Sequence, residues 1–390
     1  MRPFRVEIPQ TDLDELTQRL AGSRYPQQLP GRAWERGVPP SYLTGLVDHW
    51  REDYDWRVVE EQLNSHPQFL TEIDGVDVHF LHVRSPEPSA TPMLLTHGWP
   101  GSVIEFLDVI GPLTDPVAHG GDAADAFHLV IPSLPGFGFS SAPAEEGWDL
   151  TRTALAWAQL MARLGYDRYV PQGGDLGAWL SLVLAAVDAP HVIGAHVNFL
   201  VTAPGPDQSV LATLEPQDFA RLELLGRFVA DGSAYMAVQS TRPQTLSFAL
   251  TDSPVGQLAW MVEKFFAWSA STTSPEDALT RKQMLDHATL YWVTRTAGTS
   301  ANTYFEIADV LPTAMTPPPA PPPLPTPLGV AVYAGDSALP IRALADPQFP
   351  NIVQWVEYAE GGHFPAMEQP ATFVADLRSF ARALQPALAG

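Results

Sequence analysis

The strongest local signal for chemistry is a carboxylate set among small residues, in Gln172-Gly-Gly-Asp-Leu-Gly177. Apolar residues precede it and a nearly continuous apolar helix pattern follows over residues 178–187, so Asp175 falls at a strand-to-helix turn. Glycines let the chain reverse sharply and expose the central side chain, and the helix N-terminus stabilises its negative charge. Such a carboxylate can displace at a saturated carbon and form an enzyme ester. The alternative is an aspartate that only caps the helix.

A second acid and a histidine follow in the order that this chemistry requires. Asp336 ends the segment Tyr333-Ala-Gly-Asp after an apolar run, and His363 follows two glycines in Glu360-Gly-Gly-His. A flexible loop can bring the imidazole of His363 over Asp175, and Asp336 can orient that imidazole and stabilise its charged form. Taken alone, Asp336 is a common turn former. The chain order of nucleophile, acid and histidine is that of an α/β hydrolase.

A backbone site for a developing oxyanion is indicated by Thr96-His-Gly-Trp-Pro-Gly101. A strand that ends in His-Gly-x-Pro offers backbone N–H groups, and the residue after the nucleophile offers another. The expected donors are the N–H groups of Trp99 and Leu176, while His97, Gly98 and Pro100 shape the loop. The alternative for this hexapeptide alone is an ordinary Gly-Pro turn.

Short apolar runs predict the elements that must position these residues. Each run ends in a loop and precedes a helical pattern, which indicates a mostly parallel sheet with helices on both faces, an α/β fold. The runs lie at 93–96, 127–131, 328–333 and 352–356. Pro171 fits poorly, because a central strand should donate a hydrogen bond there.

Composition divides the rest of the chain into segments. Residues 202–311 lack such runs and read as an inserted helical lid, and the proline-rich stretch 317–327 reads as an extended connector. Residues 1–90 form an irregular meander with short helical patterns at 11–20 and 42–50, then a β-hairpin over 69–83. The hydrolase core would then occupy 91–201 and, after the connector, the remainder of 312–390.

The bulk composition excludes several other classes of function. A formal net charge of −22 repels phosphate backbones and anionic lipids, so nucleic acid and membrane surfaces are poor partners. The absence of cysteine excludes disulfides, thiolate catalysis and Cys-ligated metals. The N-terminus lacks the apolar core of a signal peptide, and no run approaches the roughly 18 apolar residues of a membrane helix. These features predict a cytoplasmic protein.

At these motifs the chain resembles the microsomal-type epoxide hydrolase family. The resemblance covers nearly the whole chain, including the N-terminal meander, His-Gly-Trp-Pro-Gly, Gly-Gly-Asp-x-Gly and Gly-Gly-His-Phe-Pro-Ala. It implies an α/β-hydrolase fold with Asp175 as nucleophile, Asp336 as relay acid and His363 as base. It also implies two lid tyrosines that donate to the epoxide oxygen, Tyr235 and Tyr304, although spacing alone could not choose these over Tyr291. The family commonly has tryptophan where this chain has Leu176, which changes the pocket wall.

The expected function is hydrolysis of a bulky apolar epoxide to a vicinal diol through an ester at Asp175, with water as co-substrate. No metal or organic cofactor is needed for this scheme. The resemblance leaves the oligomeric state open, although relatives often form homodimers. The nearest alternative is a haloalkane dehalogenase, which uses the same ester but needs halide-binding donors in place of the tyrosines. A second alternative is a non-catalytic binder of an apolar metabolite on the same fold.

Overall fold

The residues predicted to carry chemistry are attached to one mostly parallel sheet. The computed structural model describes residues 1–28, 30–31, 34–205, 208–309 and 323–388. Within these ranges nine strands form a sheet in the order β1-β2-β3-β5-β4-β6-β7-β8-β9. The first three strands pair antiparallel and the other six run parallel, as expected. The strands are β1 (Arg2–Phe4), β2 (Gln68–Ile73), β3 (Val76–Val83), β4 (Thr91–Thr96), β5 (Phe127–Pro132), β6 (Val170–Gly173), β7 (Ala195–Val197), β8 (Leu328–Tyr333) and β9 (Ile352–Tyr358).

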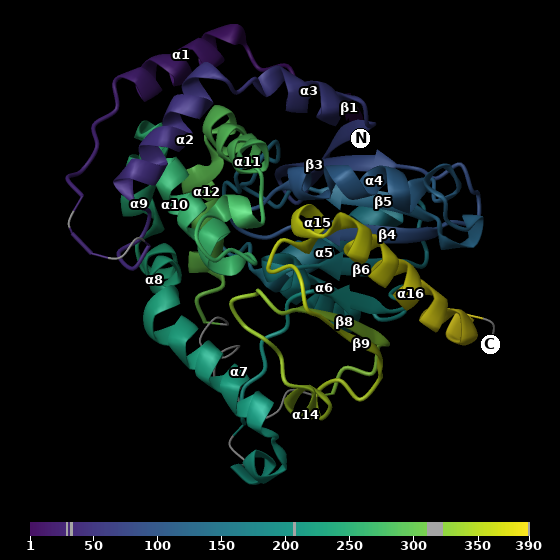
Figure 1. Cartoon of the computed structure of the whole chain (residues 1–390). Helices are drawn as coiled ribbons and strands as arrows, with labels where there is room; N and C mark the ends of the chain where they lie inside the picture. The colour runs from purple at the N-terminus through teal and green to yellow at the C-terminus, as the bar shows by residue number, and fades with distance from the viewer. Residues whose placement is uncertain (29, 32–33, 206–207, 310–322, 389–390) are drawn as a thin grey trace.

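Helices cover both faces of the sheet, because successive strand residues are apolar on opposite sides. In β4, Leu94 packs in one buried cluster with Trp157, and its neighbours Met93 and Leu95 pack in the other with Phe380. The first cluster contains α5 (Leu150–Arg163) and α6 (Asp175–Val187). The second contains α4 (Leu107–Thr114) and α16 (Pro370–Leu388). This arrangement confirms the predicted layers (Figure 1).

Between β7 and β8 the described chain is helical, and it lies beside the sheet as a separate layer (Figure 1). We call α7 to α12 the lid helices. They are α7 (Pro216–Arg227), α8 (Ala234–Thr241), α9 (Pro243–Asp252), α10 (Pro254–Trp268), α11 (Arg281–Thr294) and α12 (Thr296–Glu306). The lid was expected over 202–311, and residues 310–311 at its end lie outside the described residues. Residues 317–322 of the proline-rich connector also lie outside them.

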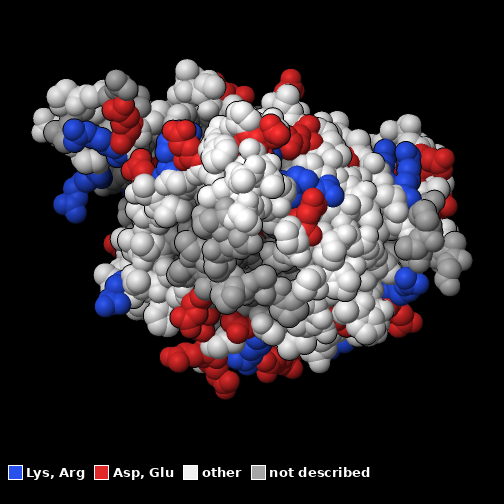
Figure 2. Space-filling view, turned by 90° about the horizontal axis from the view of Figure 1, so that it is seen from below, with Lys and Arg blue, Asp and Glu red and all other residues white. Residues whose placement is uncertain are grey.

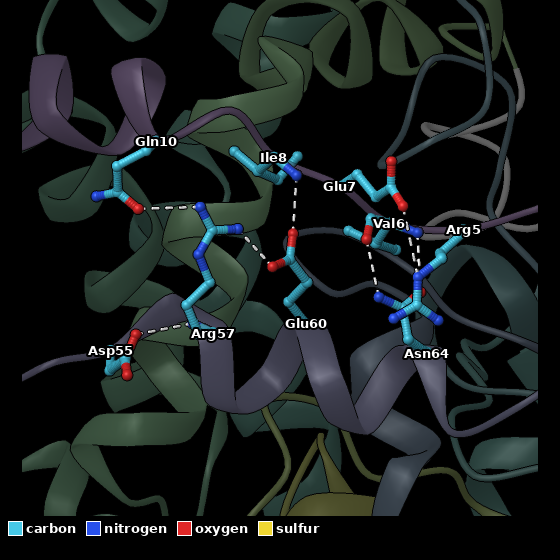
Figure 3. A network of polar contacts seen from close by, with 9 residues as sticks. All are labelled: Arg5, Val6, Glu7, Ile8, Gln10, Asp55, Arg57, Glu60 and Asn64. Carbon is cyan, nitrogen blue, oxygen red and sulfur yellow. Dashed lines mark hydrogen bonds and ion pairs between the residues drawn. The ribbon is translucent and has the colours of Figure 1, made fainter.

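The N-terminal segment is more regular than the sequence indicated. It contains α1 (Gln10–Ala21) and α2 (Pro40–Glu52), close to the two helical patterns, and also α3 (Trp56–Asn64), which was not predicted. Asp55 starts α3 by accepting a hydrogen bond from the Arg57 N–H at 2.9 Å. The side chains of α3 also hold the preceding chain, since Glu60 accepts from the Ile8 N–H at 2.8 Å (Figure 3).

The N-terminal helices also hold the lid helices in place. The indole N–H of Trp50 on α2 donates to Thr289 on α11 at 2.9 Å, and the Tyr54 hydroxyl donates to Asp286 at 2.8 Å. Removing one partner of a buried or half-buried hydrogen bond lowers stability, because the other partner is left without a hydrogen bond. The segment between β1 and β2 therefore holds the lid helices in position.

The strand pairing shows the outcome of two further expectations, the β-hairpin over 69–83 and the poor fit of Pro171. The predicted hairpin is confirmed, since β2 and β3 pair antiparallel around Asp74 and Gly75, which both adopt positive φ. Pro171 does lie within β6, but pairing with β7 is interrupted there. The regular ladder begins at Gln172, after an isolated bridge between Tyr169 and Val192.

The net charge of −22 is reflected at the surface, where the face seen in Figure 2 has no broad basic area. On that face acidic and basic side chains lie in small mixed groups separated by uncharged residues (Figure 2). In the part of the chain that the structure describes, no helix is both long and apolar enough to cross a bilayer.

Candidate active site

Asp175 occupies the turn between β6 and α6. Its φ of 51° lies in the left-handed region that residues with a side chain rarely adopt. Close backbone approach explains the small neighbours: a Cβ on Gly173 would lie 2.2 Å from Gly177, and one on Gly177 would lie 1.9 Å from the carbonyl oxygen of Thr96. The glycines permit a strained turn that presents the Asp175 carboxylate beyond the end of the strand.

The Asp175 carboxylate lies between the loop after β4 and the imidazole of His363. The Trp99 N–H donates to Oδ1 at 2.9 Å. His363 Nε2 lies 3.4 Å from Oδ2, which is long for a hydrogen bond but within ion-pair distance. Leu176 follows in the first turn of α6, where backbone N–H groups have no partner within the helix. The structure thus places the Trp99 N–H at the Asp175 carboxylate and leaves the Leu176 N–H without a partner inside α6.

His363 is oriented by Asp336, which follows β8. Its Nδ1 and the Asp336 Oδ1 are 2.9 Å apart, and both side chains are buried. The Ser337 N–H donates to the same oxygen at 2.6 Å and holds the carboxylate. The His363 N–H donates to the Trp268 carbonyl at 2.8 Å, which ties this loop to the lid helices. With Nδ1 directed to a carboxylate, Nε2 is the nitrogen that faces Asp175.

Two carboxylates decide the charge of His363. Burial would lower its pKa, but Asp336 and then Asp175 outweigh burial and hold the pKa well above its usual value. The raised pKa favours the imidazolium form of His363 in the resting protein. If Asp175 became an ester, one of the two negative charges would vanish and the His363 pKa would fall. The imidazole would then lose its proton more readily at the step that needs a base.

Tyr235 on α8 and Tyr304 on α12 face the same cavity as Asp175 and His363. Their rings meet edge to face with centroids 5.7 Å apart, and the Tyr235 ring stacks on Trp99 at 5.1 Å. Burial, followed by the Asp175 charge, raises the pKa of Tyr235 well above its ordinary value. Burial also raises the pKa of Tyr304, with smaller contributions from Tyr235 and Asp175. Both hydroxyls keep their protons at neutral pH.

Geometry separates these two tyrosines from Tyr291, which spacing could not. The Tyr291 hydroxyl is also buried, but it donates to the carbonyl of Gly101 at 2.7 Å. Its proton is thereby committed to the loop after β4. Tyr291 is also not among the residues that line the cavity between Asp175 and the lid helices.

His97 has contacts that suit a role in loop shape. Its Nδ1 lies 2.9 Å from the Gly98 carbonyl, and its Nε2 accepts from the Leu134 N–H at 3.2 Å. Burial lowers the His97 pKa to about 4, so the ring stays neutral. Gly98 leaves room for Asp175, since a Cβ on Gly98 would lie 2.3 Å from the Asp175 side chain. Pro100 follows Trp99 through a cis peptide bond.

Sequence reasoning missed a half-buried carboxyl side chain, Glu105, on the 3-10 helix η1 (Val103–Phe106). It lines a cavity of about 10 Å³ together with Asp175, His363 and Asn198. That volume and those polar groups suit one water molecule. Burial, with a smaller contribution from Asp175, raises the Glu105 pKa to about 8, although His363 opposes the shift. A charged residue inside the apolar run Val-Ile-Glu-Phe was the signal that could have found it.

Leu176 separates two larger cavities. The catalytic cavity, of about 30 Å³, and a neighbouring cavity of about 460 Å³ both include Leu176 in their walls. The second cavity has an apolar part at Leu134, Leu180 and Ile307, and charged residues such as Glu145 and Arg242 line the rest. Among the described residues, no group of three or more His, Asp or Glu side chains could hold a metal ion.

The fold and this site define an α/β hydrolase with an aspartate at the nucleophile position. Family models for the epoxide hydrolase N terminus and the α/β hydrolase fold match residues 1–106 and 91–370. A putative epoxide hydrolase of Stigmatella aurantiaca is 44% identical, covering 98% of this chain and 85% of the relative. Epoxide hydrolase 1 of Sus scrofa is 34% identical, covering 97% and 88%. The structure of Aspergillus niger epoxide hydrolase aligns with a TM-score of 0.86 at 31% identity, covering 98% and 96%. The chain therefore belongs to the microsomal-type epoxide hydrolase family.

Proposed function

We propose that this epoxide hydrolase opens its substrate through an ester at Asp175. The observation that carries the proposal is that one cavity is lined by Asp175, His363 and two protonated tyrosines, and that Asp336 orients His363 from behind that wall. The epoxide oxygen lies against Tyr235 and Tyr304, and a ring carbon faces Asp175. Asp175 forms a bond to that carbon as the C–O bond breaks, and a tyrosine gives its proton to the leaving oxygen.

Hydrolysis of the ester then uses the charge change at His363. Once Asp175 is esterified, the His363 imidazolium gives its proton, through solvent, to the tyrosinate. Neutral His363 then takes a proton from a water molecule in the cavity beside Glu105 and Asn198, and the hydroxide attacks the ester carbonyl. The N–H groups of Trp99 and Leu176 stabilise the resulting oxyanion. Collapse breaks the bond between the acyl carbon and the diol oxygen, and that oxygen takes the proton of the new carboxylic acid. The diol leaves, and Asp175 is again a carboxylate beside the His363 imidazolium. Atoms balance as epoxide plus water to diol.

A single turnover in ¹⁸O-labelled water tests the ester at Asp175. With enzyme in excess, the first diol should carry unlabelled oxygen from the carboxylate, and the label should appear in the peptide that contains Asp175. Direct attack of water on the epoxide would instead label the first diol, and that result would exclude the ester. Running the same assay with a haloalkane tests the dehalogenase alternative, which requires halide release.

Changing Glu105 to Gln should slow hydrolysis of the ester more than its formation. The substitution keeps the volume but replaces the carboxyl group that lines the water-sized cavity. Because a misplaced water loses much of its advantage over bulk water, the hydrolysis rate should fall about 10–100-fold. Rapid-quench mass spectrometry should show an adduct that accumulates during turnover. Equal slowing of both steps would argue that Glu105 only supports the loop after β4.

Changing Leu176 to Trp should narrow the substrate range. We propose that the apolar part of a bulky epoxide extends past Leu176 into the cavity of about 460 Å³. An indole at this position would close that route, whereas a small epoxide needs only the catalytic cavity. The kcat/KM for a long-chain alkyl epoxide should fall about tenfold or more, with propylene oxide changing by less than about threefold. A uniform loss for both substrates would contradict this placement.

A further inference from the structure

A buried lysine stands behind one of the two tyrosines. Lys264 on α10 is only 3% exposed, and the chain has just one other lysine, Lys282. The Lys264 Nζ lies 4.5 Å from the centre of the Tyr235 ring and 5.6 Å from that of Trp268. The Trp99 indole also stacks on the Tyr235 ring with an interplanar angle of 9°, so an indole and an ammonium both lie against this phenol.

Packing alone gives little reason for a charge at this position. Removing an ammonium from water is costly, and a Met or Leu of similar volume would fill the space without that cost. Lys264 has an ion-pair partner, since its Nζ lies 2.6 Å from a carboxylate oxygen of Glu263. The Glu263 side chain is 34% exposed, however, so the anion faces partly outward while the cation faces the aromatic ring.

The carboxylates near Tyr235 oppose its use as an acid. Asp175 and Glu263 are negative, and Tyr304 is neutral. The imidazolium of His363 shares the cavity, but Lys264 is the cation that lies against the Tyr235 ring. As Tyr235 gives its proton to the epoxide oxygen, negative charge develops on the phenol and spreads into the ring. A cation over the Tyr235 ring is attracted to the phenol more strongly in the transition state than in the ground state. This difference is the condition for accelerating a step.

We propose that Lys264 is a positioning residue that strengthens Tyr235 as the proton donor in epoxide opening. This inference rests on the proposed function, and it makes the two tyrosines unequal. Tyr235 becomes the principal acid, and Tyr304 holds the epoxide oxygen and the Tyr235 hydroxyl in place. Lys264 contacts the Tyr235 ring and has no direct role at the substrate. Its effect belongs to ester formation and not to ester hydrolysis.

The test measures ester formation directly in a His363→Gln background, in which the adduct persists. Rapid-quench mass spectrometry gives the rate of adduct formation for Lys264→Met, Lys264→Arg and the matched control Lys282→Met. Lys282 also pairs with a carboxylate, Asp286, at 2.6 Å, but its side chain is 45% exposed. We expect Lys264→Met to slow ester formation about tenfold, and Lys264→Arg and Lys282→Met to change it less than about threefold.

A second comparison separates the proposed effect from a loss of packing. Combined with Tyr235→Phe, Lys264→Met should cause no further slowing, because the proton that it assists is gone. Combined with Tyr304→Phe, it should still cause the full loss. Equal slowing in both backgrounds, or no slowing in either, would overturn the proposal. If Lys264→Met does not fold, Lys264→Gln and Lys264→Arg carry the same comparison.

The outcomes also distinguish this inference from the proposed function. If no variant forms an adduct while wild-type enzyme makes diol, the ester itself is wrong and the role of Lys264 fails with it. If adducts form at rates that do not depend on Lys264, only the role of Lys264 fails. The rate of adduct hydrolysis in a protein with His363 intact should be unaffected by Lys264→Met.

Discussion

A His363→Gln variant should accumulate a covalent adduct whose mass exceeds that of the protein by the mass of the epoxide. Ester formation uses Asp175 and the tyrosines, which this change leaves in place. Hydrolysis needs a base at the position of Nε2, and an amide cannot accept the proton from water. Steady-state diol formation should therefore fall by about 10⁴-fold. Intact-protein mass spectrometry after mixing with an epoxide measures the adduct, and peptide mapping locates it.

The matched control for this experiment is His196→Gln. His196 is as deeply buried as His363 and also pairs with an aspartate, since its Nε2 lies 2.6 Å from Asp376. It lines neither of the two cavities that contain Asp175. This variant should lose stability but trap no adduct. A His363→Gln protein that turns over normally, or that carries its adduct on a residue other than Asp175, would contradict the scheme.

The parts of the site that sequence predicted are those attached to strand ends. Asp175 and Asp336 each follow a short apolar run, and the carboxyl ends of parallel strands meet at one edge of the sheet. His363 could be placed because its two glycines mark a loop after the last strand. Local pattern and chain order were enough there, because strand and loop signals are contained in a few adjacent residues.

The parts that sequence could not predict depend on contacts between distant segments. Whether a lid tyrosine faces the cavity is decided by helix packing, which separates Tyr235 from Tyr291 only once the hydroxyl partners are known. Glu105 gains its position from a 3-10 turn beside His363, and Lys264 gains its position from α8 packing on α10. The bond between Trp50 and Thr289 spans 239 positions. No periodicity within one segment contains such information.

The Tyr235→Phe, Tyr304→Phe double variant should lose ester formation almost completely while it still binds the substrate. Without either hydroxyl, the epoxide oxygen must leave as an unprotonated alkoxide in a cavity that contains the Asp175 carboxylate. General acid catalysis commonly contributes about 10²–10⁴-fold, so ester formation should slow by about 10³-fold or more. The Tyr235 change should be the more harmful of the two, because the ammonium of Lys264 lies over that ring.

Rapid-quench measurement of adduct formation in the His363→Gln background tests this loss without interference from hydrolysis. Tyr169→Phe is the matched control. Tyr169 is buried and its hydroxyl donates a hydrogen bond to Asp188 at 2.6 Å, but it lies outside the lid helices. Removing that hydroxyl should lower the free energy of unfolding by about 1–3 kcal/mol and leave ester formation unchanged. Tyr291→Phe tests the alternative proton donor. If this change slowed ester formation as much as the double variant, the assignment of Tyr235 and Tyr304 would be wrong. The acid would then be Tyr291, whose hydroxyl donates to Gly101.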